Sequence, residues 1–167
     1  MTPWRKFLVA AIGALSVVGA GTATASADED TLIEFDSMTP VTGSAVGHLN
    51  DRNIKGGGLP WVITSGSGQV DRQGNIEIEV KGLIIPASAG FGFNPAPKFQ
   101  AVVSCLGPSG VVNVKSAAFP ASRAGDSEFE TTVALPHPCK KPEVFVGTTL
   151  GNGVFVWFAR SNAEDED

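Results

Sequence analysis

Apolar and charged residues alternate along much of this chain, and that pattern predicts β-strands. Residues 76–81 (IEIEVK) alternate strictly, and residues 128–135 (EFETTVAL) repeat the pattern with Phe129, Val133 and Leu135 on one side. Successive side chains of a strand point to opposite faces of its sheet. Each segment is therefore expected to bury its apolar face and to leave its glutamates in solvent.

Other segments are apolar on both faces, which is typical of strands that are covered on both sides. Residues 99–106 (FQAVVSCL) contain only Gln100 and Ser104 as polar positions, and residues 154–158 (VFVWF) contain none. The second of these is expected to lie deep in a sheet or against a partner. Shorter candidate strands are residues 32–35, 60–64, 111–115 and 144–146, which gives about eight strands.

Glycine, proline and asparagine mark turns between these strands. Residues 107–110 (GPSG), 71–74 (DRQG) and 150–153 (LGNG) each stand between two predicted strands and favour hairpin connections. Beyond the first 27 residues no segment has helical periodicity. The sequence predicts an all-β, antiparallel β-sandwich, immunoglobulin-like or similar, with a small β-barrel as the alternative.

The first 27 residues have the organisation of a secretory signal peptide. Arg5 and Lys6 precede a mostly apolar run over residues 7–18, and residues 25–27 (ASA) provide small residues at a cleavage site. Cleavage is predicted after Ala27. The apolar run is shorter than the roughly 20 residues of a membrane-spanning helix, so the mature protein is predicted to be secreted, without an integral membrane segment.

Charge and length limit the possible functions of the remaining chain. The whole sequence has 12 basic and 17 acidic residues, and the leader holds two basic residues and no acidic one, so residues 28–167 carry a net charge of −7. An acidic balance argues against a nucleic-acid partner. We expect one domain over residues 28–163 and a disordered acidic tail over residues 164–167.

The two cysteines, Cys105 and Cys139, are predicted to form one disulfide, since an even count in an exported chain favours a structural bond. A redox pair or a pair of metal ligands is the alternative. The sequence has no Cys-x-x-Cys motif, and Cys139 follows the stiff segment 136–138 (PHP), which favours the fixed bond. No cofactor and no metal site is predicted.

Catalytic motifs are sparse. The only histidines are His48 and His137, and no Gly-x-Ser-x-Gly motif occurs. The paired glutamates of the predicted strands point in parallel instead of facing each other across a cleft, and we expect them to pair with Lys81, Lys115 or Arg123. The protein is predicted not to be an enzyme. The alternative is a hydrolase of unfamiliar type, with His48 as base, Asp51 orienting it and Arg52 beside them.

Two long loops suggest a binding function. Residues 50–58 contain three successive glycines before Trp61, and residues 86–97 contain Phe91 and Phe93. Exposed aromatic side chains on a rigid β scaffold bind proteins or glycans. Trp61, Phe91 and Phe93 are therefore the candidate binding residues, for an extracellular protein or a cell-envelope glycan, unless they are buried as caps of the core.

A third hypothesis is a secreted protease inhibitor. Such an inhibitor presents an exposed rigid loop to the protease, and the proline-rich residues 136–142 would supply that loop.

Three segments carry a resemblance to a known group: residues 56–63 (GGGLPWVI), 99–106 (FQAVVSCL) and 135–139 (LPHPC), followed by the strand at residues 144–146. With them the chain resembles a group of small exported proteins from high-GC Gram-positive bacteria. The resemblance implies a recurrent exported domain with a disulfide between its two cysteines. It implies no activity, cofactor or catalytic residue.

Overall fold

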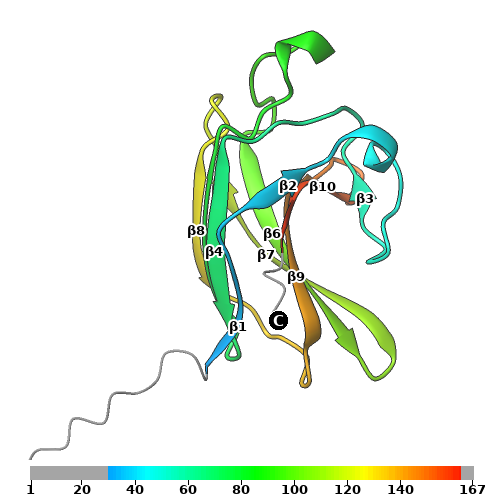
Figure 1. Ribbon diagram of the computed structural model, residues 1–167, viewed down its shortest axis with the longest axis vertical. Coiled ribbons are helices and arrows are strands. Elements are labelled where there is room, and N and C mark those ends of the chain that lie inside the picture. Colours follow the sequence, from blue (N-terminus) through cyan, green and yellow to red (C-terminus); the bar gives the residue numbers. More distant parts are fainter. Residues whose placement is uncertain (1–29, 163–167) are drawn as a thin grey trace, which may run out of the picture.

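The alternating segments form two antiparallel sheets that pack face to face in the computed structural model, which describes residues 30–162 (Figure 1). This confirms the predicted β-sandwich, since the strands form two separate sheets. Two short 3-10 helices, η1 (Gly43–Ala45) and η2 (Ala87–Ala89), interrupt the connections. The predicted signal peptide, residues 1–27, and the predicted acidic tail, residues 164–167, lie outside the described residues.

The first sheet, sheet A, has one buried and one exposed face. Its strands in spatial order are β1 (Thr31–Phe35), β4 (Ser65–Asp71), β5 (Asn75–Lys81) and β8 (Ser127–Thr132). Phe35, Ile78 and Phe129 point inward and are at most 4% exposed. The glutamates between them point outward, as the alternation predicts.

The second sheet, sheet B, is larger. Its strands in spatial order are β2 (Met38–Pro40), β10 (Phe155–Ser161), β9 (Lys140–Thr149), β6 (Lys98–Gly107) and β7 (Gly110–Pro120), and β3 (Lys55–Gly56) pairs in parallel with β10. The sequence does not predict β2 or β3, because two or three residues are too few to show a period. The predicted strand at residues 60–64 contributes only Val62, in an isolated bridge to Ile84.

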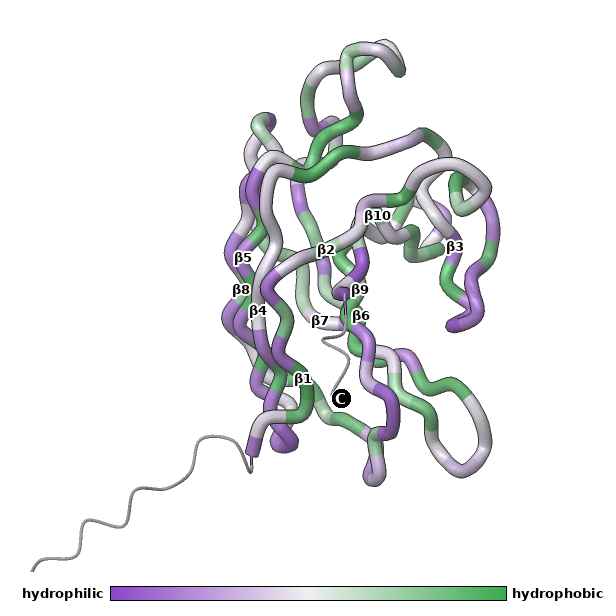
Figure 2. The backbone as a smooth tube through the Cα atoms, viewed as in Figure 1, coloured by the Kyte–Doolittle hydropathy of each residue, from purple (hydrophilic) through white to green (hydrophobic). Residues whose placement is uncertain are grey.

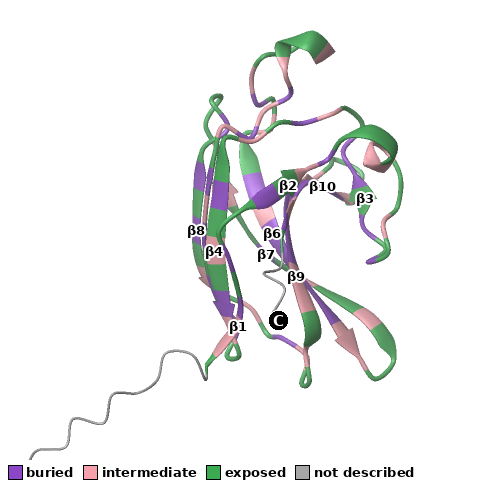
Figure 3. Cartoon of the chain, viewed as in Figure 1, coloured by how far each residue is buried: buried purple, intermediate pink, exposed green. Residues whose placement is uncertain are grey.

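The central strands of sheet B, β6, β9 and β10, have buried residues on both faces, unlike the strands of sheet A (Figure 3). Val103 and Val144 point toward sheet A, whereas their neighbours Val102 and Phe145 point to the other side, yet none of the four is more than 3% exposed. The segment of residues 43–57 lies on that outer side, beside β10 (Figure 1). The apolar character of both faces in residues 99–106 and 155–158 reflects this second layer, whereas Val154, also predicted to be buried, precedes β10 and is 45% exposed.

The predicted disulfide is present. Cys105 in β6 is bonded to Cys139, which immediately precedes β9, with a Cα–Cα distance of 4.8 Å and a sequence separation of 34. Cys105 is fully buried. A crosslink of this loop length stabilises a fold by about 3–4 kcal/mol in the chain-entropy model.

The three predicted hairpin turns also form. Gly107 pairs with Gly110, and the amide of Gly153 donates to Leu150 at 2.8 Å. At the turn between β4 and β5, Gly74 has a φ of 88° and donates to Asp71 at 3.1 Å. A Cβ at Gly74 would lie 1.9 Å from the carbonyl oxygen of Val133, so both the conformation and the space require glycine there.

Candidate functional site

Two of the three predicted binding residues lie together on a loop at one end of the sandwich. Phe91 is 39% exposed and its ring centroid lies 5.4 Å from that of Phe93, at an angle of 56°. The guanidinium of Arg123, from the connection between β7 and β8, lies 3.8 Å from the Phe93 ring centroid. We call these three residues the aromatic–arginine cluster. The loop that carries η2 and Phe91 projects from the body of the molecule (Figure 1).

Buried hydrogen bonds hold this loop in place. Asn94 is 2% exposed, and its side-chain amide donates to the carbonyls of Ser122 at 2.9 Å and Ala96 at 2.7 Å. Its backbone amide donates to Arg123 at 2.8 Å. On the other side, the amide of Gly92 donates to Ile85 at 2.9 Å. The aromatic–arginine cluster therefore sits on two loops that are fixed to each other through Asn94.

The third predicted binding residue, Trp61, is in the core, which corrects its assignment to the surface. Trp61 is 2% exposed, stacks on Phe158 with ring centroids 3.8 Å apart, and meets the edge of Phe99 at 6.5 Å. Its place beside three glycines suggested a surface loop, but Gly57 is there because a Cβ would lie 3.1 Å from the indole nitrogen of Trp61. Trp157 is also buried, at 3% exposed.

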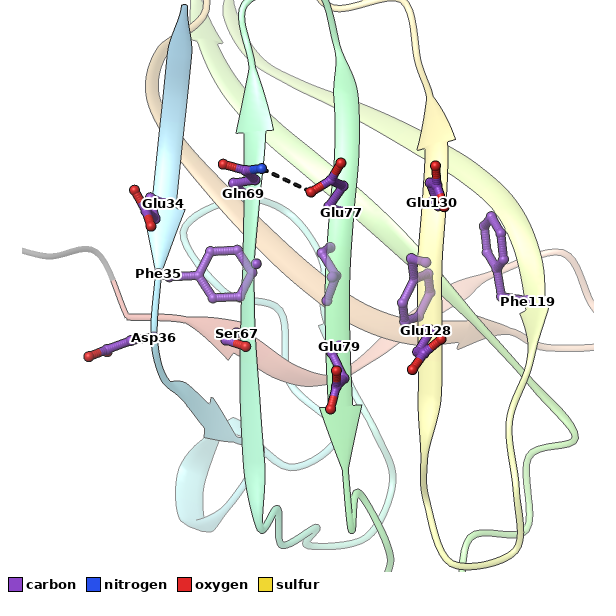
Figure 4. A pocket seen from close by; sticks show the side chains of 13 residues that line it. Glu34, Phe35, Asp36, Ser67, Gln69, Glu77, Glu79, Phe119, Glu128 and Glu130 are labelled. Carbon is purple, nitrogen blue, oxygen red and sulfur yellow. Dashed lines mark hydrogen bonds between the residues drawn. The ribbon is translucent and has the colours of Figure 1, made fainter. Parts of the chain in front are cut away.

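The outer face of sheet A is the second distinctive surface, a shallow open hollow of about 830 Å³ (Figure 4). Hydrophilic residues follow its strands in Figure 2. Six carboxylates line it: Glu34, Asp36, Glu77, Glu79, Glu128 and Glu130. Of the residues that the structure describes, no three of the His, Cys, Asp or Glu type are grouped so that they could hold a metal ion.

Like charges stand opposite each other on this face. Glu77 is the direct cross-strand neighbour of Glu130, and Glu79 that of Glu128. Lys81 forms an ion pair with Glu79, and this hydrogen bond raises the pKa of Lys81. Of the three alternatives predicted, Lys81 therefore pairs with a glutamate, although within β5 and not across strands, whereas Lys115 donates to Thr149 at 3.0 Å and Arg123 lies on Phe93. Like charges in direct cross-strand positions destabilise a sheet.

The predicted hydrolytic cluster does not assemble as a dyad. His48 is exposed, and its Nδ1 lies 2.9 Å from the carbonyl oxygen of Val46. Asp51 lies near Arg52 instead, with 3.9 Å between its carboxylate and Nε of the arginine. Among residues 30–162, no carboxylate is hydrogen-bonded to His48.

Arg52 is a buried structural cation. It is 8% exposed, and its guanidinium donates to the carbonyl of Lys141 at 2.7 Å and lies 3.3 Å from the carboxylate of Glu143. Burial raises the pKa of Glu143, and the nearby charges of Arg160 and Arg52 oppose that shift. These contacts fix residues 43–57 to the outer face of sheet B, a role that sequence proximity to His48 did not reveal.

The proline-rich segment proposed as an inhibitory loop is divided between loop and strand. His137 and Pro138 are exposed, but Lys140 already belongs to β9 and pairs with Leu106 of β6. The carbonyl of Lys141 accepts the hydrogen bond from Arg52. The exposed part is therefore shorter than the predicted loop of residues 136–142.

No protein-family model, no curated protein and no solved structure matches this chain. The assignment of a role therefore depends on the geometry described above. Neither of the two described helices, η1 and η2, is long and apolar enough to cross a membrane.

Proposed function

We propose that this protein is a non-enzymatic extracellular binding domain, and that the aromatic–arginine cluster is its contact with a partner protein. The observation that carries the proposal is the cluster of the exposed Phe91 and Arg123 with the half-buried Phe93, on loops fixed by Asn94. Aromatic residues and arginine are enriched at the centres of protein interfaces. Loops that are ordered before binding lose less conformational entropy when the complex forms.

The geometry favours a protein over a glycan. A sugar stacks best on a flat, open aromatic face, but one face of Phe93 is occupied by the guanidinium of Arg123. The rings of Phe91 and Phe93 are inclined by 56° and do not form one flat surface. Both tryptophans within the described residues, Trp61 and Trp157, are buried. An arginine with no ion pair among the described residues suits a partner that offers a carboxylate beside apolar side chains.

Support for an extracellular location comes from the predicted leader and from the Cys105–Cys139 bond, since disulfides persist in oxidising compartments. Support for a non-enzymatic role comes from the positions of His48 and Arg52. The imidazole of His48 lies beside a backbone carbonyl, and the guanidinium of Arg52 forms an ion pair with Glu143. The sequence resemblance to small exported proteins agrees with this proposal and adds no activity to it.

The test is a capture experiment with the purified, oxidised protein immobilised against culture supernatant and washed cell envelopes of its source. The Phe91→Ala/Phe93→Ala variant removes the aromatic part of the cluster. The matched control is Leu150→Ala/Val154→Ala, which removes two equally exposed apolar side chains, each 45% exposed, from the hairpin between β9 and β10.

A protein retained by the wild type and by the control, and lost with the Phe91→Ala/Phe93→Ala variant, is the expected result. If a polysaccharide is retained by the wild type and the control and lost with the Phe91→Ala/Phe93→Ala variant, the partner is a glycan and not a protein. Equal retention by all three proteins would place the contact elsewhere and contradict the proposal. Circular dichroism of the variants distinguishes lost contact from lost fold.

A further inference from the structure

The strand β7 forms one edge of sheet B, and the backbone of half of that edge is free, although the Asn113 side chain there donates to the carbonyl of Arg52 at 2.8 Å. Its only paired neighbour among the described strands is β6. Near its end, β7 is shielded by β8, because the Phe119 ring lies 5.2 Å from that of Phe129 and the Ser127 hydroxyl donates to Pro120 at 2.8 Å. The first half, residues 110–115, continues with β6 as a hairpin that extends beyond the sandwich (Figure 1).

The free half has a defined set of unpaired backbone groups. Gly107 and Gly110 close the hairpin, and in an antiparallel pair the hydrogen-bonded positions alternate with positions that point away. Val111, Asn113 and Lys115 therefore direct their N–H and C=O groups away from β6. An edge with such a row of groups is a template for another strand.

The side chains of this edge have few of the features that prevent pairing. Lys115 is the only charged residue between Gly107 and Pro120, and Val112 is 37% exposed. Residues 110–119 contain no proline, and the pairing of residues 110–115 with β6 is regular, since the register shift lies between Gln100 and Val102. The carboxylate-rich face belongs to sheet A, and of β7 only Phe119, outside the free half, lines it.

We propose that the free half of β7 pairs with the same strand of a second copy of this chain, antiparallel and about a two-fold axis at Asn113. In that register Asn113 faces itself, Val112 faces Val114 of the second copy, and Val111 faces Lys115. The outward-pointing groups of the three edge residues then form about six hydrogen bonds between the copies. The two sheets B become one continuous sheet.

The residue order along this edge favours a second copy as the occupant. The two-fold register places valines opposite valines and keeps the two Lys115 side chains apart. The Lys115 side chain also donates a hydrogen bond to Thr149 of its own chain at 3.0 Å, which directs its charge away from the second copy. A two-fold contact of this kind is self-limiting, because it consumes the same edge on both copies.

Sedimentation equilibrium of the oxidised protein over a wide concentration range tests the proposal. The wild type is expected to form a dimer as concentration rises. Val111→Pro removes an N–H that points outward and no hydrogen bond to β6, so it should weaken the dimer at least tenfold, about 1.4 kcal/mol. Val112→Lys places a charge opposite Val114 of the second copy and should weaken the dimer by a similar factor. It replaces Val111→Pro as the test if the proline disturbs the hairpin.

The matched control is Val154→Lys, which adds the same charge at an exposed valine on another hairpin and should leave the dimer unchanged. A wild type that stays monomeric at every concentration, or that binds only foreign extended peptides, would overturn the proposal. A dimer that survives both β7 substitutions would also overturn it, since the interface would then lie elsewhere. The Phe91→Ala/Phe93→Ala variant should dimerise normally, so this outcome is independent of the proposed binding function.

Discussion

The outer faces of the two sheets have opposite environments in one architecture. In sheet A the outward residues are exposed glutamates, and in sheet B the outward residues Val102, Phe145 and Trp157 are buried at 3% exposure or less. The difference arises from one segment, residues 43–57, which Arg52 fixes to sheet B. An outward position in a sandwich is therefore a core position wherever the chain returns to cover it.

The largest expected effect tests the covered face. Phe145 is fully buried on the outer side of β9, with its ring 5.8 Å from that of Trp157. Phe145→Ala should lower the free energy of unfolding by about 3–5 kcal/mol, because it removes a large buried side chain and leaves a cavity. Urea denaturation measures the change. A loss below about 1 kcal/mol would mean that residues 43–57 do not cover this face in solution.

The second effect tests the attachment of the covering segment. Arg52→Ala leaves the half-buried Glu143 with only Arg160, whose guanidinium lies 3.6 Å away and whose side chain is 43% exposed. We expect a loss of about 2–3 kcal/mol, below the roughly 3–5 kcal/mol of a fully broken buried pair, because Arg160 remains. Arg160→Ala is the control, and it should cost less than about 1 kcal/mol since that arginine is partly in solvent. Equal losses for the two variants would contradict the buried role of Arg52.

The pH dependence of the same pair sharpens this result. Burial raises the pKa of Glu143 in the folded state above its ordinary value of 4.5. Because the folded state then binds this proton more tightly than the unfolded state does, protonated Glu143 stabilises the fold below pH 4.5. This contribution is lost as the pH rises through the pKa of the folded state. Without Arg52 the folded pKa of Glu143 rises further, so the loss caused by Arg52→Ala should shrink as the solution is acidified. A loss that is independent of pH would exclude Glu143 as the reason.

The sequence predicts this fold well where neighbouring residues determine it. Strict alternation in residues 76–81 identifies a strand with one exposed face, and the two-sided apolar character of residues 99–106 identifies a covered one. The turn at residues 71–74 and the disulfide also depend on local chemistry or on simple counting. Each of these predictions is confirmed.

Contacts between distant segments decide the rest, and sequence spacing does not reveal them. Trp61 is buried because Phe158, almost a hundred residues later, stacks on it. Arg123, from the loop after β7, contacts the Phe93 ring. Arg52 contacts Glu143 and not His48, which is near it in the sequence. Of the candidate binding residues, the sequence therefore identifies Phe91 and Phe93 and misses the arginine beside them.

The smallest expected effect tests the exposed outer face of sheet A. Glu130 lies directly across from Glu77 on the outer side of sheet A, and Gln69 already donates to Glu77 at 2.9 Å. Glu130→Lys replaces a repulsive cross-strand pair by an attractive one, so it should stabilise the protein by a few tenths of a kcal/mol, and high salt should abolish the gain. Glu34→Lys is the matched control, because its cross-strand neighbour is the uncharged Gln69. A gain that is equal in both variants would reflect the lower net charge of the whole protein, whereas a gain confined to Glu130→Lys would locate the repulsion between β5 and β8.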